Sequence, residues 1–158
     1  MSHAEAVHTL QPAAGATNAL VEFTGSLRYD AIPEEARHYA RRHLLDTVGV
    51  MIAGAPGTIA TQAENVIKSV RPAGKVPVPG RERRADLLDA AFLGGTAAHG
   101  FELDDGYRHG SAHCGCVVIP ASIAVAYDRH ASGRALIEAI VAGYETNIAL
   151  ARACAPDL

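Results

Sequence analysis

The chain has 158 residues, 49% of them hydrophobic, which is a usual size for one domain with one core. Its 14 basic and 17 acidic residues are spread along the chain with a net charge of −3, so no clustered basic face is available for nucleic acid or anionic lipid. Its three cysteines are an odd number in a chain large enough to be stable without disulfides, which favours a reducing, cytoplasmic location.

The N-terminal segment is alanine-rich and has no basic start followed by an apolar run, so it predicts neither a signal peptide nor a membrane anchor. Charges, glycines or prolines interrupt every later apolar stretch before it reaches the roughly 18 residues that span a bilayer. We therefore expect no membrane partner, a loose tail over residues 1–16 and one helical domain over residues 17–158.

Two helices are predicted first. A short helix begins at Thr17 or Asn18, either of which could cap it, and weakens at Gly25. A long helix follows with Pro33 at its first position and ends at the turn over residues 54–57. Its apolar residues recur at helical spacing: Ala36, Ala40, Leu44, Val48 and Met51.

A third helix fits residues 59–70. Its predicted apolar side consists of Ala63, Val66, Ile67 and Val70. The segment 75–80 is too rich in proline for a central strand and is predicted to be an extended connector.

The helix predicted over residues 86–99 is unusual for its small side chains, which are Ala90, Ala91, Gly94, Gly95, Ala97 and Ala98. Each glycine costs a helix roughly 1 kcal/mol relative to alanine, so we expect another backbone to approach closely there.

A polar stretch over residues 102–115 separates this helix from the last two. Pro120 is predicted to open a helix that ends near Ala131, and a final helix covers about residues 134–153. The chain has no internal repeat and no convincing hairpin pattern, so the expected fold class is all-α.

Ionisable side chains concentrate in and beside the polar stretch: His99, Glu102, Asp104, Asp105, Arg108, His109 and His113. Carboxylates and imidazoles at this density, on a glycine-flanked loop, suit proton transfer and the binding of a polar ligand. The alternative is structural: the two aspartates cap or solvate a turn, and His99 is a core histidine bonded to a carbonyl.

The same region resembles the MmgE/PrpD family. That family's signature is an alanine-rich helix, then acidic-x-Asp-Asp, then His-Pro-Gly and an apolar-Pro-Ala. The segments similar to it are 96–105, 113–115 and 118–121, and two further landmarks, 44–49 and 143–145, occur in the family's order. The resemblance extends over about residues 20–152.

The resemblance implies a large all-α domain that is usually completed by C-terminal sequence, with a smaller lid domain inserted. We therefore expect the lid, and further catalytic groups including a histidine and a lysine, to lie outside this chain. Family members include 2-methylcitrate dehydratase, cis-aconitate decarboxylase and iminodisuccinate epimerase, which act beside a carboxylate and generally need no cofactor. The implied function is that of a lyase or epimerase, with dehydration the leading reaction. The implied partners are a small polycarboxylate and either a second copy, as a homodimer, or a complementary C-terminal chain.

By position, Glu102, Asp105 and His113 resemble acidic-loop groups that line the family's pocket, and Asp104 would orient the loop. Removing a proton beside a carboxylate leaves excess charge on it, so the site needs donors and one group that moves the proton. Histidine can do either, and a neighbouring carboxylate fixes its tautomer. We predict that His113 is the acid/base or a donor to the substrate carboxylate, with Asp104 or Asp105 orienting it.

Arg108 and His109 are predicted to bind substrate together with Glu102. The chain departs from the family pattern at three positions. Glu102 is more usually Asp, Gly106 is often Thr, and Cys114 replaces the proline of His-Pro-Gly.

Two other interpretations concern the same chain. His109, His113, Cys114 and Cys116 offer metal-ligand atoms, but the two cysteines lack the two-residue gap of structural zinc sites and no second pair follows, so no metal is predicted. The alternative function is a non-catalytic helical interaction module that keeps the family core as a scaffold.

Overall fold

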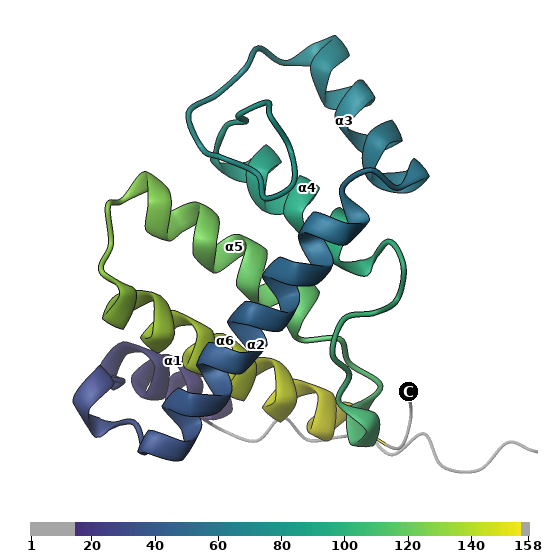
Figure 1. Ribbon diagram of the computed structural model, residues 1–158. Coiled ribbons are helices and arrows are strands. Elements are labelled where there is room, and N and C mark those ends of the chain that lie inside the picture. Colours follow the sequence, from purple (N-terminus) through teal and green to yellow (C-terminus); the bar gives the residue numbers. More distant parts are fainter. Residues whose placement is uncertain (1–14, 156–158) are drawn as a thin grey trace, which may run out of the picture.

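The computed structural model describes residues 15–155, which form six α-helices (Figure 1). They are α1 (Ala16–Ser26), α2 (Glu34–Gly54), α3 (Thr58–Val70), α4 (Leu87–His99), α5 (Gly115–Asp128) and α6 (Gly133–Cys154), with short 3-10 helices η1 (Tyr29–Ala31) and η2 (Arg108–Gly110). Within this range the only β pairing consists of two isolated bridges, Val76 with Ala85 and Tyr107 with Ala112. The all-α prediction is confirmed. The tail predicted over residues 1–16 lies outside the described residues except for Gly15 and Ala16.

Helix α2 crosses the molecule and contacts α4, α5 and α6, as Figure 1 shows. The most extensive helix pair is α4 with α5, and α3 packs on α4. One core cluster joins α3, α4, α5 and the connector after α3: Ile67, Val76, Val78, Ala85, Ala90, Leu93 and Ala124. A second joins α2, α5 and α6: Ala40, Ile119, Ile137 and Ile140.

The close approach predicted for α4 is confirmed. A Cβ added at Gly94 would lie 2.7 Å from Met51 Cε and 3.0 Å from the Cβ of Pro120. On the opposing helix, a Cβ at Gly54 would collide with the carbonyl of Ala97. The small residues therefore let α2 and α5 approach the α4 backbone, which compensates the helix-propensity cost of glycine.

Helix α5 begins at Gly115, so the prediction that Pro120 opens it is wrong. Pro120 lies inside the helix and has no N–H for the carbonyl of Cys116, four residues earlier. A Cβ at Gly95 would lie 2.8 Å from that carbonyl, so only glycine leaves room for α4 against it. The carbonyl that Pro120 leaves without a helical amide partner therefore faces the backbone of α4 at Gly95, and this packing permits a proline inside α5.

Helix α1 is confirmed, but neither Thr17 nor Asn18 caps it. It begins at Ala16, and its N-cap is Gly15 with a φ of 90° and no side-chain hydrogen bond. Glycine adopts this left-handed conformation without steric cost, so Gly15 can begin the helix without a capping side chain.

Helix α3 is also confirmed, but its predicted apolar side is wrong in part. Val66 and Val70 are 64% and 71% exposed, whereas Glu64 is buried. The Glu64 carboxylate is paired with the guanidinium of Arg81 at 2.9 Å and with Lys68 at 3.1 Å. The ion pairs compensate the desolvation of the carboxylate and hold the connector over α3.

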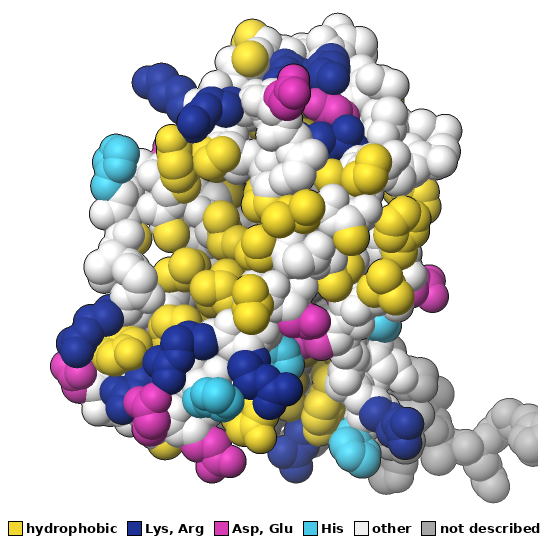
Figure 2. Space-filling model, in the orientation of Figure 1, with side chains coloured by type: hydrophobic (Ala, Val, Ile, Leu, Met, Phe, Trp, Pro, Cys, Tyr) yellow, Lys and Arg dark blue, Asp and Glu magenta, His cyan; other side chains and the backbone are white. Residues whose placement is uncertain are grey.

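The surface separates apolar and charged regions along the molecule. Figure 2 shows hydrophobic side chains over the middle of one face, with charged side chains towards the two ends. In the described part of the chain no single helix is both long and apolar enough to cross a membrane, and α2 and α3, which would be so only together, meet at a bend of 78°.

Candidate active site

The candidate site is the loop that leaves α4 at His99 and enters α5 at Gly115. The amide of Tyr107 donates to the carbonyl of Ala112 at 2.7 Å, which closes the far end of the loop. Glu102 and Ser111 have φ angles of 51° and 46°, a region that non-glycine residues adopt at a steric cost. Such conformations persist where surrounding contacts hold them, and they are frequent at functional sites.

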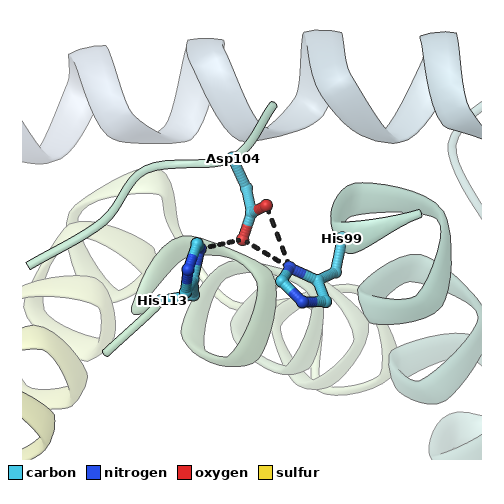
Figure 3. A group of neighbouring side chains, drawn as sticks. All are labelled: His99, Asp104 and His113. Atoms are coloured by element: carbon cyan, nitrogen blue, oxygen red, sulfur yellow. Dashed lines mark hydrogen bonds and ion pairs between the residues drawn. The ribbon is translucent and has the colours of Figure 1, made fainter. Parts of the chain in front are cut away.

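The carboxylate of Asp104 forms hydrogen bonds with two histidines that lie towards opposite ends of this loop (Figure 3). Its Oδ1 lies 3.0 Å from Nδ1 of His99, and its Oδ2 lies 3.2 Å from Nδ1 of His113. The carboxylate is fully buried, whereas the side chains of His99 and His113 are 47% and 45% exposed. One buried carboxylate therefore orients two half-exposed imidazoles.

The charge of Asp104 decides the tautomers of its partners. Burial raises the pKa of Asp104, but hydrogen bonds from the Cys116 thiol and from His99 outweigh this, and the pKa lies below its ordinary value. An ionised Asp104 accepts Nδ1–H from each imidazole, which leaves Nε2 of each neutral ring as a base. Burial and Asp104 together raise the pKa of Cys116 to about 12, so this residue is a neutral thiol at neutral pH.

Asp105 forms a second cluster that faces α2 and α6. Its Oδ1 accepts the amide of Gly115 at 2.7 Å, and its Oδ2 accepts the hydroxyl of Tyr144 at 2.7 Å. Nδ1 of His43 lies 3.0 Å from the same Oδ2. Burial raises the pKa of Asp105, but hydrogen bonds from His43 and Tyr144 lower it by a larger amount, so the pKa lies below its ordinary value. Asp105 thus connects the loop to α2, α5 and α6, and it accepts a hydrogen bond from the first backbone amide of α5.

Tyr144 donates to this cluster as a neutral phenol. Burial and the hydrogen bond to Asp105 raise the pKa of Tyr144 well above its ordinary value. The cluster is tight around Gly115, where an added Cβ would lie 2.6 Å from Asp105 Oδ1 and 2.7 Å from Thr47 Oγ1. Only glycine fits at the start of α5.

Two hollows lie beside the loop. One, of about 370 Å³, is lined by His113 and Arg108 together with Gly106, Tyr107, Ser111 and Ala112. The other, of about 540 Å³, is lined by His43 and Asp105 together with Tyr39, Arg42, Leu45 and Asp46. Each hollow therefore has an imidazole held by a carboxylate and an arginine that can attract an anion.

The predicted site residues divide into two groups. Asp104 and His113 are in contact, and Arg108 lines the same hollow as His113. Glu102 and His109 are exposed, and among the contacts of residues 15–155 none joins either side chain to Asp104 or Asp105. Their predicted roles in substrate binding remain predictions.

The structure also brings in histidines that sequence reasoning did not assign. His99 was the alternative core histidine, but it is half-exposed and bonded to Asp104 rather than to a carbonyl. His43 lies on α2, about sixty residues before the loop, and Tyr144 lies on α6 within a family landmark. Because His43 and Tyr144 are far from the loop in sequence, no local pattern indicated that they contact Asp105.

The fold and this loop define a class of protein: an all-α domain that presents imidazoles oriented by two adjacent carboxylates, Asp104 and Asp105, before the start of a helix. A sequence model of the MmgE/PrpD N-terminal domain matches residues 18–157, and the chain belongs to the MmgE/PrpD family.

One similar curated protein is the cis-aconitate decarboxylase-like protein oryM of Aspergillus oryzae. It is 29% identical over 142 residues, which cover 85% of this chain and 30% of that protein. The chain therefore spans about a third of the length of this relative. No solved structure gave a significant match.

Proposed function

We propose that the chain is the loop-bearing part of a lyase or epimerase that acts on a small polycarboxylic acid. The reaction is proton transfer at a carbon next to a carboxylate, with dehydration as the leading reaction. The observation that carries the proposal is the contact of His113 with the buried carboxylate of Asp104, on the family's acidic loop. The name of the similar protein, a cis-aconitate decarboxylase-like protein, supports a polycarboxylate as the substrate class.

In this proposal His113 is the base. Asp104 holds its Nδ1–H, so Nε2 takes the proton from the substrate carbon. The electron pair of that C–H bond forms a double bond, and the hydroxyl on the neighbouring carbon takes a proton and leaves as water. His99, the second imidazole on Asp104, is our candidate for supplying that proton, and for this step its Nε2 must first carry a proton in addition to the Nδ1–H held by Asp104.

The substrate carboxylate next to the reacting carbon gains negative charge as the proton leaves. Arg108 lines the hollow beside His113 and is our candidate for binding this carboxylate. The guanidinium can offer two parallel N–H donors to it, which would fix the substrate's orientation as well as its charge.

We propose that the complete site needs further sequence, because the chain spans 30% of the length of the similar protein. The partner is either a complementary C-terminal chain or a second copy in a homodimer. Three free thiols fit a cytoplasmic location, and the reaction as written takes no cofactor.

The test is turnover after the chain is combined with a candidate C-terminal partner from the same genome. 2-Methylcitrate, citrate and cis-aconitate are supplied in turn, with excess chelator, and the products are identified by NMR. We expect an unsaturated product that needs both chains. Specific binding of the two chains without turnover of any polycarboxylate would favour the non-catalytic module instead.

A further inference from the structure

The side chains of His99, Asp104 and His113 converge on one point beside the loop (Figure 3). One ligand atom from each, an imidazole nitrogen or a carboxylate oxygen, lies within 4.8 Å of the other two. The two rings stand edge to face, with their centres 4.9 Å apart, on either side of the carboxylate. Two imidazoles and one carboxylate are a ligand set that divalent transition metals bind.

The distances suit a small ion. Zinc bonds imidazole nitrogen and carboxylate oxygen at about 2.0–2.2 Å in tetrahedral geometry, which places neighbouring ligand atoms about 3.3 Å apart. The contacts of Asp104 with Nδ1 of His99 and of His113 are 3.0 and 3.2 Å. The ligand atoms of the trio lie within 4.8 Å of one another, so the two half-exposed rings would have to move together by up to about 1.5 Å to bind one ion next to the fixed carboxylate.

The arrangement differs from the ligand set considered from sequence. Cys114 is buried and its thiol contacts Asn147 at 3.4 Å, while His109 stacks edge-on against Tyr107. Neither residue points to the convergence of the trio, and His99 supplies the ligand that sequence spacing did not predict.

We propose that His99, Asp104 and His113 form a binding site for one divalent transition-metal ion of the zinc or cobalt type. The ion takes the place of the hydrogens that the two rings share with Asp104. Three protein ligands leave a coordination position open, as in exchangeable rather than closed structural sites. Binding does not depend on the proposed function, but an ion on His113 would block its use as a base.

The test is titration of the tag-free chain of 158 residues with Co²⁺, followed by visible absorption, and with Zn²⁺, followed by calorimetry. We expect one ion per chain at this site and a Co²⁺ spectrum of low-symmetry N and O coordination. His99→Ala should weaken binding about tenfold or more, since it removes one of three ligands. His109→Ala removes a loop histidine outside the trio and should leave the affinity unchanged.

His113→Ala provides a second variant, in case one substitution disturbs the loop, and circular dichroism checks the fold of each. Equal affinities in wild type, His99→Ala and His113→Ala would overturn the proposal, as would an equal loss in His109→Ala. Because the readout is metal binding, a chain that binds Zn²⁺ but supports no turnover with its partner in excess chelator, where the ion is removed, would count against the proposed function alone.

Discussion

Among single residues, the adjacent aspartates Asp104 and Asp105 bind different partners. Asp104 holds the two half-exposed histidines, while Asp105 binds a helix amide, a tyrosine and His43. Neighbouring side chains outside a helix point in different directions, so each aspartate faces its own cluster. The sequence indicated an acidic loop with His113 in it, but it could not choose the orienting aspartate, because the choice depends on loop torsions and on residues of α2 and α6.

Gly115 provides a prediction at this scale. In Gly115→Ala the new Cβ would meet Asp105 Oδ1 and Thr47 Oγ1 at 2.6 and 2.7 Å, so the loop or the helix start must shift. We expect a loss of about 1–3 kcal/mol in the free energy of unfolding, measured by urea denaturation.

The matched control is Gly133→Ala. Gly133 is also the first residue of a helix, but an added Cβ meets nothing within 4 Å. We expect this variant to be as stable as the wild type or slightly more stable. Equal stabilities of the two variants would show that the packing around Gly115 is not the constraint described here.

At the scale of helices, local signals predicted most of the chain. Helix α2 was predicted from its proline and its apolar spacing, and the final helix predicted over about residues 134–153 is α6. The start of α5 was missed because Asp105, ten residues away from Gly115, provides the amide's partner. The face of α3 was missed because Arg81, seventeen residues from Glu64, makes burial of that carboxylate possible.

The start of α4 gives a prediction for pH. Asp86 accepts the amide of Asp89 at 3.1 Å, and this bond, with help from Arg71, lowers the pKa of Asp86 below its ordinary value of 3.8. A carboxylate with a lowered pKa stabilises the folded state above pH 3.8, and that contribution is lost as the pH falls through the folded pKa.

We therefore expect Asp86→Ala to lower the Tm at pH 7, and the difference from wild type to shrink as the pH falls below 3.8 through the folded-state pKa of Asp86. Thermal unfolding followed by circular dichroism measures both. Glu82→Ala, an exposed acid in the preceding loop, is the control and should change neither value. A difference that stays constant with pH would mean that the charge of Asp86 does not support the cap.

At the scale of the whole molecule, apolar side chains remain exposed between α3, α4 and α5. They line a groove of about 520 Å³ that includes Ile59, Phe92 and Val117, which are 58%, 59% and 60% exposed. Apolar surface of this kind favours association in water.

We expect the isolated chain to self-associate and to bind a hydrophobic dye, as measured by sedimentation velocity and fluorescence. Phe92→Gln should reduce both without lowering the Tm, because the ring is largely outside the core. Leu45→Gln is the control, because Leu45 is even more exposed on α2 but lies outside this groove. A monomeric wild type without dye binding would contradict the prediction.

The central claim is that His113, held by Asp104, moves a proton at a carbon next to a carboxylate. The most direct measurement is deuterium exchange: the complete enzyme turns over its polycarboxylate in D₂O, and NMR follows label at that carbon and in the product. We predict that His113→Asn lowers turnover and exchange together by roughly 10²–10⁴-fold, the usual contribution of an acid or base, with little change in Tm. His130→Asn, at an exposed histidine between α5 and α6 away from the loop, is the control and should retain both. A His113→Asn enzyme that melts at a lower temperature but exchanges and turns over at the wild-type rate would show that His113 is structural and would contradict the claim.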